Sequence, residues 1–233
     1  PLNVTDLEFG KDGAMYFITG GRGTQSGLYR VSYVGSKPET ISKKTDSKAT
    51  AKARELRHAL EKFHGKQDKK AVAFAWPHLD SNDRWIRYAA RIAIEGQPVE
   101  TWKDRALSET RTNAALTALL ALARVGGKET QNDLLLALKK FPMDGLSEAR
   151  QLEKLRVIEL SFTRQGRPSP ELAKLAIEKL DRLYPAKSEA LNRELCQLLI
   201  YLDAPGVVGK TLSLLGAAKT QEEQIYYIYR LRT

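Results

Sequence analysis

The feature that most constrains this chain is a helical period of apolar residues, which begins near Ala49 and continues to the end of the 233 residues. Side chains on one face of an α-helix recur every three or four positions, because the helix has about 3.6 residues per turn. The clearest run contains five leucines at this spacing, Leu191, Leu195, Leu198, Leu199 and Leu202. Such stripes predict amphipathic helices, each of which must bury its apolar face against a neighbour.

Prolines and capping residues divide this region into short segments. Six of the nine prolines lie where a helix is expected to begin or end, and Ser169 before Pro170 has the pattern of an N-cap followed by proline at the first helical position. The predicted helices cover residues 50–64, 67–79, 82–95, 98–107, 110–125, 129–141, 147–165, 170–183, 188–202, 205–215 and 219–232.

After the first, these helices form pairs. The second members are expected to begin near residues 82, 110, 147, 188 and 219, so the pairs recur every 30 to 40 residues or so. A pair with two apolar faces can bury both faces only by stacking on neighbouring pairs. We therefore predict a mainly α fold over residues 49–233, an α-solenoid (α-α superhelix) of the HEAT type.

Residues 1–35 follow a different pattern. Apolar and acidic residues alternate over 5–9, which is the period of a half-buried strand. Further strands are predicted at 14–18 and 27–33, with a glycine-containing turn at 10–13. Because three short strands cannot bury a core alone, we predict a short antiparallel β segment that resembles part of a β-propeller blade.

The basic charge of the chain is unevenly distributed. Residues 36–48 are polar and charged, which predicts a basic linker. Of the net charge of +10, 11 basic and 5 acidic residues between Ser36 and Lys70 supply +6, and the other 198 residues supply +4. This concentration favours a local contact with an acidic protein surface and argues against a long nucleic-acid groove. No run reaches the roughly 18 apolar residues that span a bilayer, so we expect no membrane span.

The two ends of the chain indicate a piece of a longer protein. Pro1 stands directly before strand-like sequence, and the last helix, 219–232, has no glycine or proline stop after it. We therefore expect further domains, and any targeting signal, to lie outside these residues.

The most distinctive local motif is 82–91, with the sequence NDRWIRYAAR. It resembles the second helix of a HEAT repeat, in which an aspartate precedes a helix with arginine and small residues. Either Asn82 or Asp83 suits the N-cap position, and Asp83 can pair with Arg87 one turn later.

The side chains of this motif allow two interpretations. Arg84, Arg87 and Arg91 are expected to share one helix face, since they recur at three- and four-residue intervals. They predict either an arginine ladder that braces neighbouring turns, or a contact surface for an anion or a partner peptide that includes Trp85 and Tyr88.

Trp76, Pro77 and His78 lie near the end of the preceding helix. Proline removes a hydrogen-bond donor and bends the helix, and we add Trp76 and His78 to the candidate interaction surface. The other histidines, His58 and His64, fall on another predicted helix. Because no supporting carboxylate spacing accompanies them, we predict neither a metal site nor another cofactor in this chain.

Two further features bear on chemistry. The loop 20–24 contains three glycines around Arg22, but a strand rather than a helix follows it, so we predict an inter-strand loop and not a phosphate site. Arg22 stays a candidate for the mouth of a propeller.

Cys196 is the only cysteine and lies in an apolar helix. A single cysteine excludes an internal disulfide and a CxxCH haem attachment. No catalytic constellation stands out, so we expect no enzyme activity from these residues.

Several runs resemble one family. Residues 4–16 and 20–31 look like the closing blade of a sugar-dehydrogenase-type propeller, and 75–79, 87–91, 192–196 and 220–225 look like the helical part of the same proteins. These are the large exported PVC-type proteins described as membrane-bound dehydrogenases or haem-binding proteins, built as propeller, HEAT repeats and c-type cytochrome. The resemblance implies a periplasmic or envelope location and a redox parent that carries haem c outside this chain.

We therefore expect a non-catalytic connector that holds a dehydrogenase-like propeller next to a cytochrome domain and offers a protein-docking surface. Neighbouring propeller and cytochrome domains would then be its partners. The alternative is a nucleic-acid-binding HEAT-like module, similar to the HEAT-type DNA glycosylases, which the face formed by Arg84, Arg87 and Arg91 with nearby Trp85 and Trp76 would serve.

Overall fold

The computed structural model describes residues 3–21, 23, 25–35 and 47–232. The chain divides into two compact units, Pro1–Ser47 and Lys48–Thr233. Of the predicted linker, residues 36–46 lie outside the described residues.

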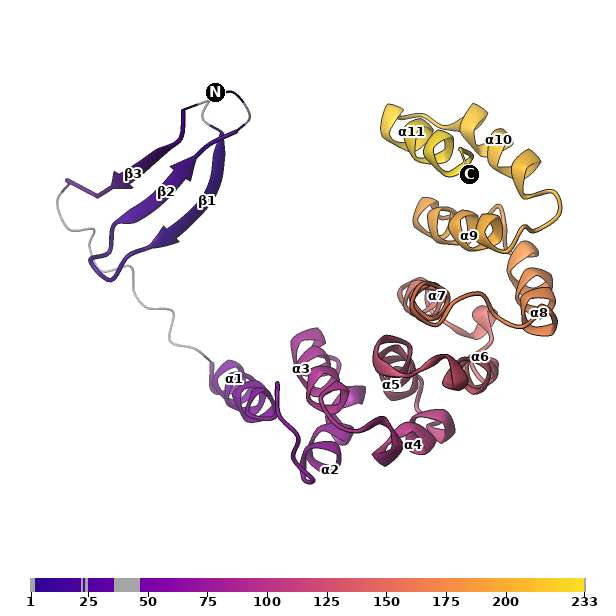
Figure 1. Ribbon diagram of the computed structural model, residues 1–233, viewed down its shortest axis with the longest axis horizontal. Helices are drawn as coiled ribbons and strands as arrows, with labels where there is room; N and C mark the ends of the chain where they lie inside the picture. Colours follow the sequence, from indigo (N-terminus) through magenta and orange to yellow (C-terminus); the bar gives the residue numbers. More distant parts are fainter. Residues whose placement is uncertain (1–2, 22, 24, 36–46, 233) are drawn as a thin grey trace. The chain divides into compact units, whose positions relative to one another are not determined.

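The first unit contains a three-stranded antiparallel sheet with the order β1-β2-β3 (Figure 1). The strands are β1 Val4–Phe9, β2 Met15–Thr19 and β3 Gly27–Val31. Met15 at the start of β2 lies opposite both Phe9 and Val31. The β1–β2 turn places Gly13 at φ 78°, a conformation that glycine adopts without strain. The short antiparallel sheet predicted from the sequence is confirmed.

Large apolar side chains of this sheet remain exposed. Phe9 is 66% and Leu28 72% exposed, and the stacked rings of Phe17 and Tyr29, with centroids 5.0 Å apart, cover part of one face. Within the described part of this unit, Ala14 and Thr19 are the buried side chains. The sheet therefore does not enclose a core of its own, as expected for three short strands.

The second unit is helical, which confirms the mainly α class. Its α-helices are α1 Lys48–Glu61, α2 Ala71–Ala75, α3 Arg84–Glu95, α4 Lys103–Ser108, α5 Thr112–Val125, α6 Gln131–Leu138, α7 Glu148–Gln165, α8 Pro170–Asp181, α9 Glu189–Tyr201, α10 Val207–Ala217 and α11 Gln221–Arg230. Short 3₁₀ helices stand between them: η1 Trp76–Asp80, η2 Val99–Thr101, η3 Lys128–Thr130 and η4 Met143–Gly145.

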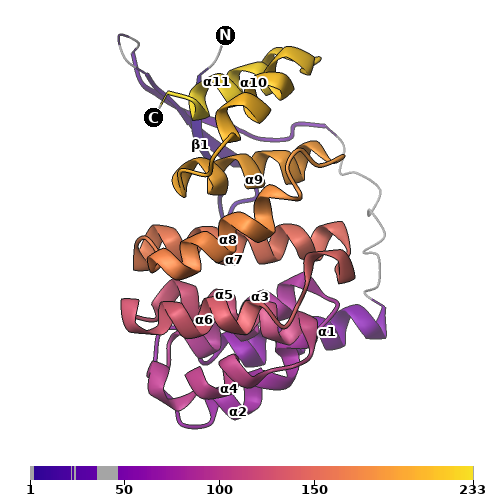
Figure 2. The same ribbon diagram turned by 90° about the vertical axis from the view of Figure 1, so that its right-hand side faces the viewer.

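The helices of this unit are arranged in two layers (Figure 1). Helices α1, α3, α5, α7, α9 and α11 pack in sequence against one another in one layer. The other layer contains α2, α4, α6, α8 and α10, each of which contacts the odd-numbered helix that follows it in the chain. In the turned view α7, α9 and α11 follow one another along the stack (Figure 2). The second helix of each predicted pair thus forms the continuous layer.

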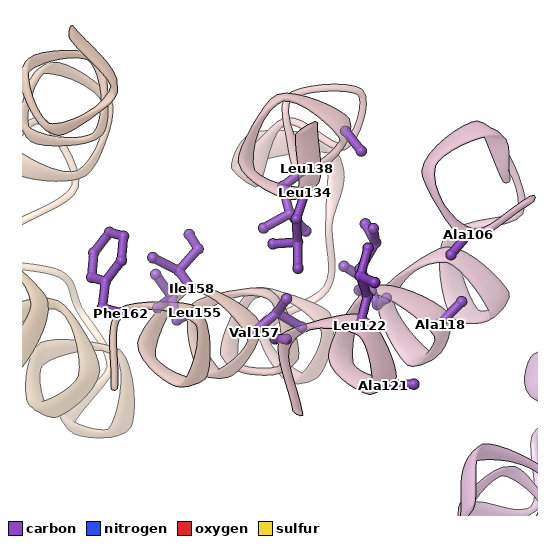
Figure 3. Packing of buried hydrophobic residues seen from close by; sticks show 14 of the residues in the cluster. Ala106, Ala118, Ala121, Leu122, Leu134, Leu138, Leu155, Val157, Ile158 and Phe162 are labelled. Atoms are coloured by element: carbon purple, nitrogen blue, oxygen red, sulfur yellow. The ribbon is translucent and has the colours of Figure 1, made fainter. Parts of the chain in front are cut away.

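The core follows the junction of the layers. Eight residues of α5 are buried, in agreement with its apolar sequence on all sides. Leu134 and Leu138 of α6 point toward Leu122 of α5 and Ile158 of α7 (Figure 3). A single buried cluster extends from Leu60 to Tyr227, so the pairs share one core instead of enclosing separate ones.

Side-chain caps begin several helices where the sequence predicts them. Asp83 accepts hydrogen bonds from the backbone nitrogens of Trp85 and Ile86, and Ser169 accepts one from Leu172 N at 3.4 Å. Asp83, and not Asn82, is therefore the N-cap of α3. Each cap satisfies a backbone donor that the first helical turn leaves without a partner.

The structure corrects three predicted helices. The segments 67–79, 98–107 and 129–141 each contain a short 3₁₀ helix in addition to an α-helix. In the first of them Pro77 lies at the second position of η1, where its missing N–H costs no helical hydrogen bond. These helices belong to the second layer, whose α2, α4 and α6 are the shorter ones.

Candidate functional site: an arginine groove

An open groove of about 620 Å³ lies along the continuous layer of the helical unit. Its charged lining consists of Arg84, Arg87, Arg91, Arg156 and Arg193 with Glu153 and Glu194. Tyr88, Thr117 and apolar residues of α5, α7 and α9 complete it. We call this site the arginine groove. Five guanidinium groups face two carboxylates there, so the lining carries a basic excess that suits an anionic ligand.

Arg87 has a bracing role. Its Nη1 donates hydrogen bonds to the carbonyl oxygens of Ser81 at 2.6 Å and Asn82 at 3.2 Å, and its Nη2 lies 3.5 Å from Glu153 of α7. The guanidinium therefore ties the loop before α3 to α7. The predicted pair with Asp83 is replaced by these contacts, because the Asp83 carboxylate caps the helix.

Arg91 is also mainly structural. It is 8% exposed and forms an ion pair with Glu95, which in turn lies 2.9 Å from Nε of Arg124 in α5. Its guanidinium also lies 5.1 Å from the centre of the Tyr88 ring. The arginine-ladder interpretation thus describes Arg87 and Arg91.

Arg84 and its aromatic neighbours differ from these two. Trp85 and Tyr88 are more than half exposed, and the Arg84 guanidinium lies 4.7 Å from the centre of the Trp85 ring. Among the described residues, no carboxylate lies within ion-pair distance of Arg84. Arg84, Trp85 and Tyr88 therefore form the part of the motif that is available to a ligand. A guanidinium above an aromatic ring keeps its hydrogen-bond donors free.

Two of the groove arginines come from distant helices. Arg156 of α7 forms an ion pair with Glu159, and Arg193 of α9 lies 2.5 Å from Glu189 and 3.4 Å from Glu222. The sequence pattern does not single them out, because each reads as part of a charged helix face. Their spacing to a glutamate three or four residues away indicated only solvent-exposed pairs.

Glu194 adds a titratable group to the groove. Burial raises the pKa of this carboxyl, and the nearby Glu159 raises it further, while Arg156 and Arg230 act in the opposite direction. A carboxyl whose pKa is raised loses its negative charge more readily as the pH falls. As the pH falls, Glu194 is therefore neutralised before a carboxyl of ordinary pKa, and the net charge of the arginine groove becomes more positive.

Trp76 lies in the core instead of on a surface. Its side chain is 0% exposed, its Nε1 donates a hydrogen bond of 2.9 Å to Glu109, and the Arg105 guanidinium lies 4.4 Å from its ring centre. The prediction that Trp76 contributes to an interaction surface fails for this reason. The neighbouring Pro77 indicated a bent helix end and gave no sign that the tryptophan is buried.

Of the remaining predicted site residues, His78 does not line the groove. His78 in η1 is half-buried, with its ring against the edge of Phe74 at 5.8 Å between centroids. Arg22 lies outside the described residues. The structure thus brings together Arg84, Arg87, Tyr88 and Arg91 in the lining, with Trp85 beside Arg84.

Three further features of the described part of the chain concern its cysteine, its possible metal ligands and the length and polarity of its helices. Cys196 is buried, with its sulfur 3.7 Å from the Thr211 hydroxyl oxygen. Across the described residues no group of three or more His, Cys, Asp or Glu side chains is placed to hold a metal ion. Within the same residues, the helices are too short or too polar to cross a bilayer.

Comparison with family models, with curated proteins and with solved structures finds no match to this chain. The chain is therefore described by its own structure: a small open sheet, followed in the sequence by a two-layered helical unit with an arginine-lined groove.

Proposed function

We propose that this chain is a scaffold built as an α-solenoid of the HEAT type, which docks an acidic protein segment in the arginine groove. The observation that carries the proposal is the convergence of five arginines from α3, α7 and α9 on one groove next to the exposed rings of Trp85 and Tyr88. Exposed aromatic and arginine side chains are enriched where partners bind.

Most of these arginines already contact glutamates, and this favours a protein over a nucleic acid. Arg87, Arg91, Arg156 and Arg193 each pair with a carboxylate of the chain itself. A nucleic acid would be bound mainly through the release of counterions by many free basic groups. A short acidic segment can bind through Arg84 and by replacing the glutamates that pair with the more exposed groove arginines, Arg156 and Arg193.

In its parent protein, the scaffold would connect a dehydrogenase-like propeller to a c-type cytochrome domain in the periplasm or envelope. This part of the proposal rests on the resemblance of the sequence runs. The open sheet supports it, since further blades of a propeller would cover its exposed Phe9 and Leu28. Reading the coding sequence on both sides tests it: propeller blades before residue 1 and a CxxCH motif after residue 233 are expected. Flanks that lack both would refute the connector role.

The docking function is tested by fluorescence anisotropy with a labelled decaglutamate peptide. Reversal of charge by Arg84→Glu is expected to weaken binding by about tenfold or more, because it removes an attraction and adds a repulsion. Arg164→Glu is the matched control, because Arg164 is an exposed arginine of α7 that does not line the groove. Equal loss in both variants would show that only net charge matters and would contradict a specific groove.

A nucleic-acid-binding module is the second candidate, and the clustering of the five arginines is the observation that favours it. A labelled DNA duplex in the same assay distinguishes the two. If the duplex binds tightly, the affinity falls steeply with salt and Arg84→Glu abolishes binding, then the ligand of the arginine groove is a nucleic acid and not an acidic protein segment. Weak duplex binding that Arg84→Glu and Arg164→Glu reduce alike would reject this candidate.

A further inference from the structure

A second cavity, of about 530 Å³, lies between α6, η4, α7 and α8. Its walls are mostly apolar and come mainly from leucines, among them Leu135, Leu138, Leu172, Leu175, Leu180 and Leu183. Figure 3 shows part of this wall, where Leu138 of α6 and Ile158 of α7 face one another. Pockets of this size and character are typical of small-molecule sites with a few polar groups.

Lys154 of α7 is the buried polar group in the lining of this cavity. The residue is 8% exposed, and its Nζ donates a hydrogen bond of 2.6 Å to the carbonyl oxygen of Phe141. An ammonium group has two further donors, and no carboxylate of the described residues lies within ion-pair distance of it. A buried cation without a counterion is costly, and burial lowers the pKa of Lys154 to about 8.

The mouth of the cavity carries more basic than acidic groups. Lys139 directly after α6, Lys179 of α8 and Arg182 directly after α8 line it, with Asp144 of η4 as the one carboxylate in the lining. Glu178 partly neutralises the α8 groups, at 3.0 Å from Arg182 and 3.7 Å from Lys179. The field at the entrance therefore attracts an anion.

We propose that this cavity is a binding site for an aliphatic carboxylate, whose chain packs among the leucines of α6 and α8 while its carboxylate pairs with Lys154 Nζ. An apolar wall with one buried ammonium group matches an amphiphilic anion better than a neutral lipid or a polar phosphate. A neutral chain would leave the ammonium without a counterion, and a phosphate would leave the apolar wall exposed to water.

The site is independent of the arginine groove, although α7 contributes to both. Lys154 faces α6 and α8, whereas Arg156, two positions later, faces the groove. Binding at this cavity is therefore testable without reference to the docking function.

The test compares octanoate with octanol by isothermal titration calorimetry on the whole chain. We expect octanoate to bind more tightly than octanol at neutral pH, and Lys154→Met to reduce the octanoate affinity by about tenfold or more with little effect on octanol. Lys174→Met is the matched control, because Lys174 is an exposed lysine of α8 outside the lining. Octanoate binding should also weaken as the pH rises above about 8, where free Lys154 loses its proton.

Two results would overturn the proposal. One is equal affinity for octanoate in the wild type and in Lys154→Met, which would leave an apolar cavity without carboxylate preference. The other is octanoate binding that survives Ala176→Phe, since a large side chain at this lining position should block the cavity while Lys154 stays in place. The second variant also decides the matter if Lys154→Met does not fold.

Discussion

Lys154 makes the stability of the helical unit depend on pH. Its pKa is about 8 in the folded chain and 10.5 ordinarily, because burial disfavours the charged form. Between these values the unfolded chain holds a proton that the folded chain has released. The free energy of unfolding is therefore expected to rise as the pH increases from about 8 to about 10.5.

Urea unfolding at several pH values measures this rise. Lys154→Met should abolish the contribution of residue 154 to the slope, whereas the exposed control Lys174→Met should keep it. The same pH dependence in the wild type and in Lys154→Met would contradict the assignment.

Glu109 gives a dependence of the same sign at acid pH, because its pKa is also lowered in the folded chain. Hydrogen bonds from Arg111, and from Trp76 Nε1, lower the pKa of its carboxyl from 4.5 to about 2. The stabilisation is present above pH 4.5 and is lost as the pH falls to about 2, since the unfolded chain binds the proton first. In Glu109→Gln this acid-sensitive component should disappear, which urea titrations between pH 2 and pH 5 or so would detect. An unchanged acid profile in Glu109→Gln would refute this role.

Buried polar residues are what the sequence pattern predicts least well. Lys154 lies among charged neighbours and resembles a solvent-facing lysine, although its position four and eight residues before Ile158 and Phe162 places it on their buried face. Trp76 shows the converse problem. Its burial depends on Glu109, 33 positions away, which accepts its N–H.

Among the secondary-structure elements, α3 offers a direct test through its N-cap residue, Asp83. Replacing Asp83 by alanine removes the acceptor for the backbone nitrogens of Trp85 and Ile86 and is expected to cost about 0.5–2 kcal/mol of stability. Asn82→Ala is the matched control, because Asn82 precedes the cap and should change stability little. Chemical denaturation decides between them, and a larger loss for Asn82→Ala would reassign the cap.

Element boundaries were predictable where local signals act alone. Helices α8 and α9 begin within two residues of their predicted starts, since the caps Ser169 and Ser188 are local features. The division of 67–79 into α2 and η1 was not predictable. Both helix types use the same apolar period over one turn, and packing against α3 and α5 decides between them.

At the scale of the whole molecule, the arginine groove exists only through the stacking of helices. Arg84, Arg156 and Arg193 are separated by 72 and 37 positions, yet all three line one surface. Sequence patterns identified the α3 part of this site, because its motif is contiguous. To predict the α7 and α9 parts, one would need to know how three helix pairs align along the stack, and the spacing of the pairs in the sequence does not give this alignment.

The same stacking predicts how the chain tolerates truncation. The buried apolar cluster extends from Leu60 to Tyr227 and so lies wholly within the unit Lys48–Thr233. Removing residues 1–47 should therefore leave the helical circular dichroism intact and shift the Tm of that unit by no more than about 2–4 °C, equivalent to roughly 1 kcal/mol. Removing residues 1–61 is the control, because it also deletes the fully buried Leu60 of α1, which packs on α3. Loss of such a side chain costs about 2–5 kcal/mol, so this truncation should melt clearly earlier. A similar fall in Tm for both truncations would mean that residues 1–47 are required for the stability of the helical unit.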